Sequence, residues 1–76
     1  MKELLTYLVQ NLVDQPEAVS VTEQENAGGT VFEIRVASGD MGKVIGRQGR
    51  IIKEVRTLMK SVAQRKGKRV TVEVVD

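Results

Sequence analysis

The sequence predicts an α+β fold of order αββααβ, in which a three-stranded mixed sheet carries three helices on one face. Two segments, 2–14 and 50–66, repeat apolar residues with the period of an amphipathic helix. Three other segments alternate apolar and polar residues, as half-buried strands do. The segment between the second and third strands is too long for a hairpin and holds two helices. We therefore expect a right-handed crossover that makes these two strands parallel.

The first half of the chain predicts a helix followed by a β-hairpin. Leucines and valines recur at helical spacing in segment 4–13. Pro16 is expected to end this helix, because the residue before a proline avoids the α region. Alternation in segments 19–23 and 32–36 indicates two strands, the first at an edge of the sheet. Asn26-Ala27-Gly28-Gly29 has the composition of a turn, so the two strands should pair antiparallel.

The second half predicts a short helix, a long helix and a last strand. Ser38-Gly39-Asp40 is expected to cap a short helix from Met41 to Ile45. The long helix 50–66 follows with one apolar face, and Gly67 is a suitable residue to end it. Valines alternate with polar residues in segment 70–74, which indicates the third strand.

Gly46-Arg47-Gln48-Gly49 joins these two helices and is the most informative segment of the chain. Because glycine lacks a Cβ, it permits left-handed conformations and leaves backbone N–H groups uncovered. These groups open onto the start of the long helix, where the helix dipole favours anions such as phosphate. Arg47 and Arg50 add positive charge at the same place. A tight helical corner without a ligand is the alternative interpretation, and the arginine inside the loop argues against it.

The net charge of +2 conceals a strong segregation of charge. Ten basic residues and one acidic residue, Glu54, lie between Lys43 and Arg69, whereas the rest of the chain carries two basic and nine acidic residues. Such a concentration predicts a positive surface for a polyanion. The alternative is a basic face that only solvates a helix, which fits a face of mixed sign better than this one.

The composition argues against several classes of function. The chain has no cysteine and no histidine, so we expect no metal and no other cofactor. The phosphate-loop pattern G-x-x-x-x-G-K-[ST] is absent, and Asp40 and Glu54 lack a convincing catalytic partner. We therefore expect neither enzymatic activity nor a small-molecule substrate. No apolar run is long enough to span a membrane, and the N-terminus lacks the layout of a signal peptide, which favours the cytoplasm.

The segment from Val44 to Lys53 resembles the signature of the KH domain, V-I-G-x-x-G-x-x-I-K. The order αββααβ is similar to the type II arrangement of that fold. The resemblance covers residues 1–76 as a single KH domain, like the small bacterial proteins of the KhpA family. It implies non-catalytic binding of single-stranded RNA, or less often DNA, in the role of an RNA chaperone or post-transcriptional regulator. The positions that match the signature are Val44, Ile45, Gly46, Gly49, Ile52 and Lys53.

The resemblance also implies a groove between the glycine loop with its flanking helices and an edge of the sheet. The loop would clamp the backbone of about four nucleotides. Val44 and Ile45 would form part of an apolar floor, and Arg50 and Lys53 would supply charge. The expected RNA-binding residues are Lys43, Val44, Ile45, Gly46, Arg47, Gln48, Gly49, Arg50 and Lys53. The candidates on the sheet side are Phe32, Ile34 and Arg35, although Phe32 is more typical of a core.

Only Tyr7 and Phe32 are aromatic, and neither lies in the basic segment. Base stacking should therefore contribute little, and binding should depend on charge, shape and salt. A single groove of this size binds weakly, which favours a homodimer or a second RNA-binding partner. The resemblance implies a larger KH-containing partner of the KhpB/Jag type.

Two rival interpretations remain. In the first, the chain is a KH-fold protein-interaction module that has lost RNA binding. In the second, the basic amphipathic helix lies on an anionic membrane. The second conflicts with the need for that helix in the core of so small a domain, so no membrane partner is expected.

Overall fold

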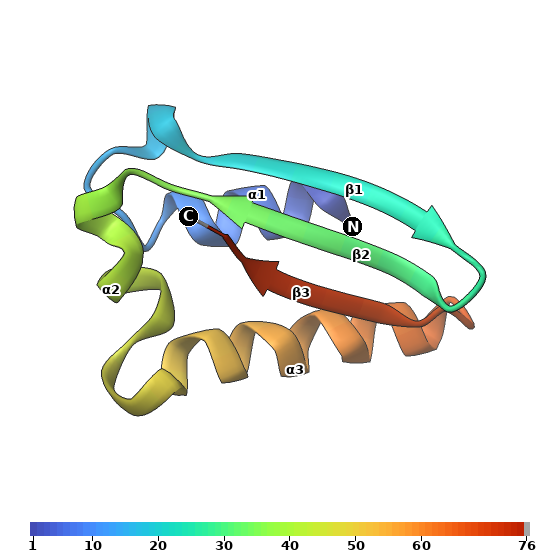
Figure 1. The fold of residues 1–76 in the computed structure, drawn as a ribbon. Coiled ribbons are helices and arrows are strands. Elements are labelled where there is room, and N and C mark those ends of the chain that lie inside the picture. The colour runs from blue at the N-terminus through green and yellow to red at the C-terminus, as the bar shows by residue number, and fades with distance from the viewer. Residues whose placement is uncertain (76) are drawn as a thin grey trace.

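The computed structural model describes residues 1–75, which form a three-stranded sheet packed against helices (Figure 1). The sheet has the order β1-β2-β3, in which β1 pairs antiparallel with β2 and β3 pairs parallel with β2. This confirms the predicted mixed sheet and the crossover between the second and third strands. The strands are β1 (Ser20–Asn26), β2 (Gly29–Arg35) and β3 (Val70–Val74). The helices are α1 (Lys2–Gln10), α2 (Met41–Ile45) and α3 (Arg50–Arg65).

One face of the sheet is buried against the helices. On β2, every second residue from Thr30 to Ile34 is buried, while the residues between them are partly exposed. Helices α1 and α3 contribute Leu5 and Met59 to the same apolar core, and α2 closes one end of the sheet beside α3 (Figure 1). No helix within residues 1–75 is long and apolar enough to cross a membrane.

Helix α1 ends earlier than its apolar period predicts. It stops at Gln10, where the Asn11 side-chain amide donates a hydrogen bond to the Tyr7 carbonyl at 2.7 Å. The Leu12 N–H then donates to the Val9 carbonyl, three residues back, so the chain forms a 3-10 type turn in place of a further α-helical turn. The prediction of a helix to Asp14 ended by Pro16 is therefore wrong. Pro16 instead begins a separate 3-10 turn that runs to Ala18.

The hairpin is longer than predicted, because strand pairing continues up to the turn. Asn26 and Gly29 are the last paired residues, and the Asn26 side-chain oxygen accepts a hydrogen bond from the Gly28 N–H at 2.9 Å. This bond fixes the turn, as asparagine commonly does. Compared with the predicted segments 19–23 and 32–36, each strand extends three residues further toward the turn and is one residue shorter at its other end.

A buried carboxylate ties the first connection of the chain to the start of α2. Asp40 is only 3% exposed, and its two oxygens accept hydrogen bonds from the backbone N–H groups of Asp14 (3.2 Å) and Gln15 (3.0 Å). The sequence predicts that Ser38-Gly39-Asp40 caps α2 through its side chains. Asp40 is the N-cap residue of α2, but the expected side-chain capping bond is absent, because the Asp40 carboxylate turns toward segment 11–15 instead.

We expect Asp40→Ala to lower the free energy of unfolding by about 1–3 kcal/mol, because two partly buried N–H groups lose their acceptor. Urea unfolding followed by circular dichroism measures this change. Glu17→Ala is the control, since it removes an exposed carboxylate from the same connection without touching these bonds. Equal midpoints for the two variants would contradict the role given to Asp40.

Candidate nucleic-acid interface

The glycine loop is a compact kink between α2 and α3. Gly46 has φ 78° and ψ 173°, and its N–H donates to the Gly42 carbonyl at 2.8 Å, which closes α2. Gly49 has φ 74°, and its N–H donates to the Gly46 carbonyl at 3.1 Å. Gln48 between them is also left-handed, with φ 58°. The predicted left-handed kink is confirmed, and one of its residues is not glycine.

The two glycines are required for different reasons. A Cβ on Gly46 would lie 2.6 Å from the Ile51 Cγ1 atom and 2.8 Å from its Cβ, so no side chain fits between the loop and α3. A Cβ on Gly49 would meet nothing within 4 Å, so only its positive φ favours glycine there. Gly46 therefore sets how closely α2 approaches α3, whereas Gly49 only permits the turn.

The N-terminus of α3 faces this loop without a side-chain cap. Gly49 is the N-cap residue and has no side chain to accept hydrogen bonds from the first N–H groups of the helix. The helix has 16 residues, and the positive end of its dipole lies beside exposed Arg47 and Arg50. The Arg50 N–H donates to the Arg47 carbonyl, so the arrangement offers the other uncapped backbone donors and two guanidinium groups to an anion.

The predicted site residues fall into two groups. Arg47, Gln48, Arg50 and Lys53 are exposed, and Ile45 is partly exposed at the same corner. Val44 differs, because its side chain is 0% exposed and belongs to the core. Its side chain therefore cannot contact a ligand in this structure. Of the two residues expected to form an apolar floor, only Ile45 has an exposed side chain.

Lys43 is held by two carboxylates. Its ammonium lies 3.1 Å from an oxygen of Asp14 and 4.0 Å from an oxygen of Asp40. The hydrogen bond with Asp14 and the negative charges of both residues raise the pKa of Lys43. The positive charge of Lys43 is thus balanced by carboxylates of the protein itself, and the ion pair with Asp14 links α2 to segment 11–15.

The three candidate residues on the sheet side also differ in their exposure. Phe32 and Ile34 are 0% exposed and lie in the core, so neither can line a groove. Arg35 is exposed and lies 3.9 Å from Glu33 on the uncovered face of β2. The residue that actually bridges helix and sheet is Arg56, whose Nε donates to the Val72 carbonyl of β3 at 2.9 Å. Its position three residues after Lys53 is the signal that the sequence offers, since residues three apart share one side of a helix.

Within residues 1–75, no group of three or more histidine, cysteine, aspartate or glutamate side chains could hold a metal ion. What the loop offers is backbone N–H groups, two arginines and a partly apolar surface at Ile45.

Comparison with known proteins identifies the family. The family model described as the KH domain of KhpA and KhpB matches residues 2–74. This chain belongs to that family. The resemblance drawn from segment 44–53 is confirmed, and the type II KH fold with it.

Similar bacterial proteins match over nearly the whole chain. The RNA-binding protein KhpA of Chlamydia trachomatis serovar D is 47% identical over 76 residues, which covers 100% of this chain and 97% of that protein. The RNA-binding protein KhpA of Clostridium acetobutylicum is 47% identical over 75 residues and covers 99% of this chain and 100% of that protein. These relatives carry the name of RNA-binding proteins rather than of enzymes, in agreement with the prediction of a non-enzymatic protein.

A solved structure shares the fold. A crystal structure of Aquifex aeolicus Era Y63A bound to GDP.AlF4- aligns with 97% of this chain at a TM-score of 0.65 and 22% identity. This chain spans 30% of that one, so the likeness concerns one part of Era and shows the fold alone.

We expect Gly46→Ala to destabilise the domain by more than about 3 kcal/mol, because strained backbone and steric overlap add together. Gly49→Ala should cost only about 1–2 kcal/mol, since its φ is strained but the space is open. Urea unfolding of both variants gives the comparison. Equal losses would mean that the contact between Gly46 and Ile51 does not determine the corner.

Proposed function

We propose that this protein binds single-stranded RNA without catalysis and that the loop Gly46–Gly49 holds the RNA backbone. The observation that carries this proposal is the uncapped N-terminus of α3 beside two exposed arginines, Arg47 and Arg50. The names of the KhpA relatives support RNA as the ligand. Single-stranded DNA is the less favoured ligand of the same site.

In this proposal the backbone N–H groups of Arg47 and Gln48 and the Arg47 guanidinium contact phosphates, because the N–H groups of Gly46 and Gly49 already donate to backbone carbonyls. Ile45 supports the bases. Gln48 is exposed at the tip of the loop and can donate further hydrogen bonds, while Arg50 and Lys53 add charge on α3. Aromatic stacking contributes little here, because Phe32 is buried in the core and the exposed Tyr7 belongs to α1, outside the basic segment. Binding is therefore weak and dependent on salt, and it favours unpaired RNA over duplex.

The cellular role that fits such a site is that of an RNA chaperone or post-transcriptional regulator in the cytoplasm. One short groove gives modest affinity, so the protein acts as a homodimer or with a larger KH-containing partner of the KhpB/Jag type. A specific surface supports an interaction of this kind. An apolar hollow lies between α1 and α3, lined by Leu8, Leu12, Ile51, Glu54, Val55 and Leu58.

The alternative function is a KH-fold module that binds only proteins. Such a module would bind its partner at the same hollow, where Leu58 is 42% exposed. The exposed arginines of the loop favour RNA binding over this alternative, and the two activities can coexist on one chain.

The double variant Arg47→Asp with Gln48→Asp should abolish binding of a short single-stranded RNA and leave the fold intact. Both side chains are exposed, and two new negative charges would repel the phosphates. Fluorescence anisotropy at low salt measures the affinity, with a duplex of the same sequence as competitor, and circular dichroism verifies folding.

Lys2→Asp with Gln24→Asp is the matched control, since it makes the same change of charge at exposed positions of α1 and β1. Unchanged affinity in the loop variant would refute the proposed clamp. A duplex that competes as well as the single strand would refute the proposed groove.

Leu58→Asp should weaken self-association, because it places a charge in the apolar hollow between α1 and α3. Sedimentation velocity at micromolar concentration compares this variant with wild type and with Gln24→Asp on exposed β1. A wild-type protein that stays monomeric and recovers no KH-containing partner from cells would refute this part of the proposal.

A further inference from the structure

Strand β1 is an edge strand, because the sheet has the order β1-β2-β3 and β1 forms one border of it (Figure 1). All of its residues, from Ser20 to Asn26, pair with β2 in unbroken register, so the strand contains no bulge. It also contains no proline and no lysine, which often keep an edge strand from pairing with another chain. A regular edge of this kind can accept a further strand.

The backbone groups of Glu23 and Glu25 point outward from this edge. Opposite residues of an antiparallel pair either bond to each other or both point away. The Thr30 N–H donates to the Arg69 carbonyl at 2.9 Å, on the side of β3, so Thr30 points away from β1. Glu25 lies opposite Thr30 and therefore points away from β2, and so does Glu23, two residues earlier. The N–H and C=O groups of both glutamates are thus open to a further strand.

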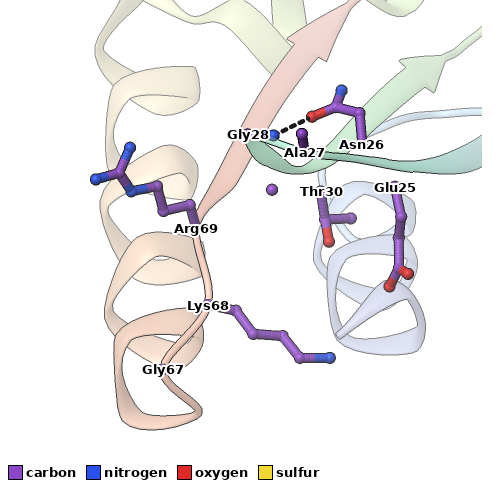
Figure 2. Close-up of a pocket in the computed structure, with 9 residues that line it drawn as sticks. Glu25, Asn26, Ala27, Gly28, Thr30, Gly67, Lys68 and Arg69 are labelled. Carbon is purple, nitrogen blue, oxygen red and sulfur yellow. Dashed lines mark hydrogen bonds between the residues drawn. The ribbon is translucent and has the colours of Figure 1, made fainter.

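The side chains of these two glutamates share one face of the sheet. Because side chains alternate along a strand, Glu23 and Glu25 lie on the same face as the buried Val21. Figure 2 shows the alternation beside the turn, where the Glu25 side chain points toward the side of α1 and the Asn26 side chain points to the opposite side. Both glutamates are exposed, so the edge presents two carboxylates at alternate positions.

No ion pair neutralises the charge of this edge. From Glu3 to Ile34 the chain has six acidic residues and no basic one. Lys68 lines the same hollow as Glu25 beside the hairpin turn (Figure 2). The ion pairs found within residues 1–75 nevertheless include neither this lysine nor the glutamates of β1. The edge of β1 is therefore negative, and a cationic partner complements it.

We infer that the outer edge of β1 binds an extended cationic segment of a second protein, which adds to the sheet as a fourth strand antiparallel to β1. Two lysines at alternate positions of this segment lie opposite Glu23 and Glu25, and their backbone groups bond to those of the same glutamates. A second copy of this chain does not fit, since pairing of β1 with β1 places glutamates opposite glutamates. Such binding requires neither RNA nor the glycine loop.

Two heptapeptides of threonine with two lysines test this pairing on the full chain. In the first, lysines occupy the third and fifth positions, so both face the glutamates. In the second, they occupy the third and fourth positions and point to opposite faces. Titration of the isotope-labelled protein, followed by two-dimensional NMR, should shift the amide signals of Glu23 and Glu25 and leave those of segment 46–49 in place. The second peptide should bind about two- to threefold more weakly, because it keeps one charge pair of two.

The charge and the backbone of the pairing are tested separately. Glu23→Gln with Glu25→Gln should weaken binding of the first peptide about fivefold, because both cross-strand charge pairs are lost. Glu3→Gln with Glu17→Gln is the matched control, since it removes the same charge from exposed positions outside the sheet. Methyl groups on the two lysine backbone nitrogens of the peptide should abolish binding. Methyl groups on its fourth and sixth nitrogens, which point away from β1, should not.

Several results would overturn the added strand. Equal binding of the two peptides, or equal losses in the two glutamine variants, would mean that the acidic half of the chain attracts cations without pairing. An equal effect of the two methylation patterns would exclude backbone bonds to β1. If dilution of wild type alone shifts the same amide signals, a second copy occupies the edge and the cationic segment does not. Absence of any shift at millimolar concentrations of the first peptide would also refute the inference.

Discussion

The contact between Gly46 and Ile51 is the constraint on which the rest of the interface depends. Helix α2 has five residues and is far too short to be stable alone. It is held at its end by the close approach of Gly46 to α3 and at its start by Asp40, which binds the backbone of Asp14 and Gln15. With both ends fixed, the loop between α2 and α3 projects from a rigid corner. Its backbone is thus ordered before any ligand binds, which lowers the entropic cost of binding.

The sequence predicts well those elements whose signal is local and regular. Strand β3 agrees with the alternation of its valines, and α3 agrees with its apolar period to within one residue, since Gly67 ends it in the left-handed conformation. The kink at Gly46 and Gly49 follows from glycine itself. In each case one physical property acts on neighbouring residues and needs no knowledge of distant contacts.

What the sequence does not predict depends on partners far along the chain. Helix α1 ends at Gln10, although Leu12 and Val13 continue its apolar period and pack partly buried against the core outside the helix. The apolar period thus shows which residues are buried, but it does not show where the helix ends. Asp40 bonds to the backbone of Asp14, 26 residues away in sequence, and Lys43 pairs with the Asp14 side chain, 29 residues away, and no spacing rule reveals this. Likewise, the signature residue Val44 shows which family the chain resembles, but only the packing shows that its side chain is buried.

Helix α3 shows how so small a domain can combine stability with two kinds of contact. Its buried face, centred on Val55 and Met59, supplies the core. The cationic stripe of Lys53, Arg56 and Lys60 lies about 100° to one side of that face, along β3. Ile51 and Leu58 lie about 100° to the other side, in the hollow against α1. Because the two outer faces are separated by the core, a partner seated against α1 leaves the cationic stripe free. The proposed RNA binding and the proposed protein association are therefore compatible on one helix, and neither requires exposure of the residues that keep the domain folded.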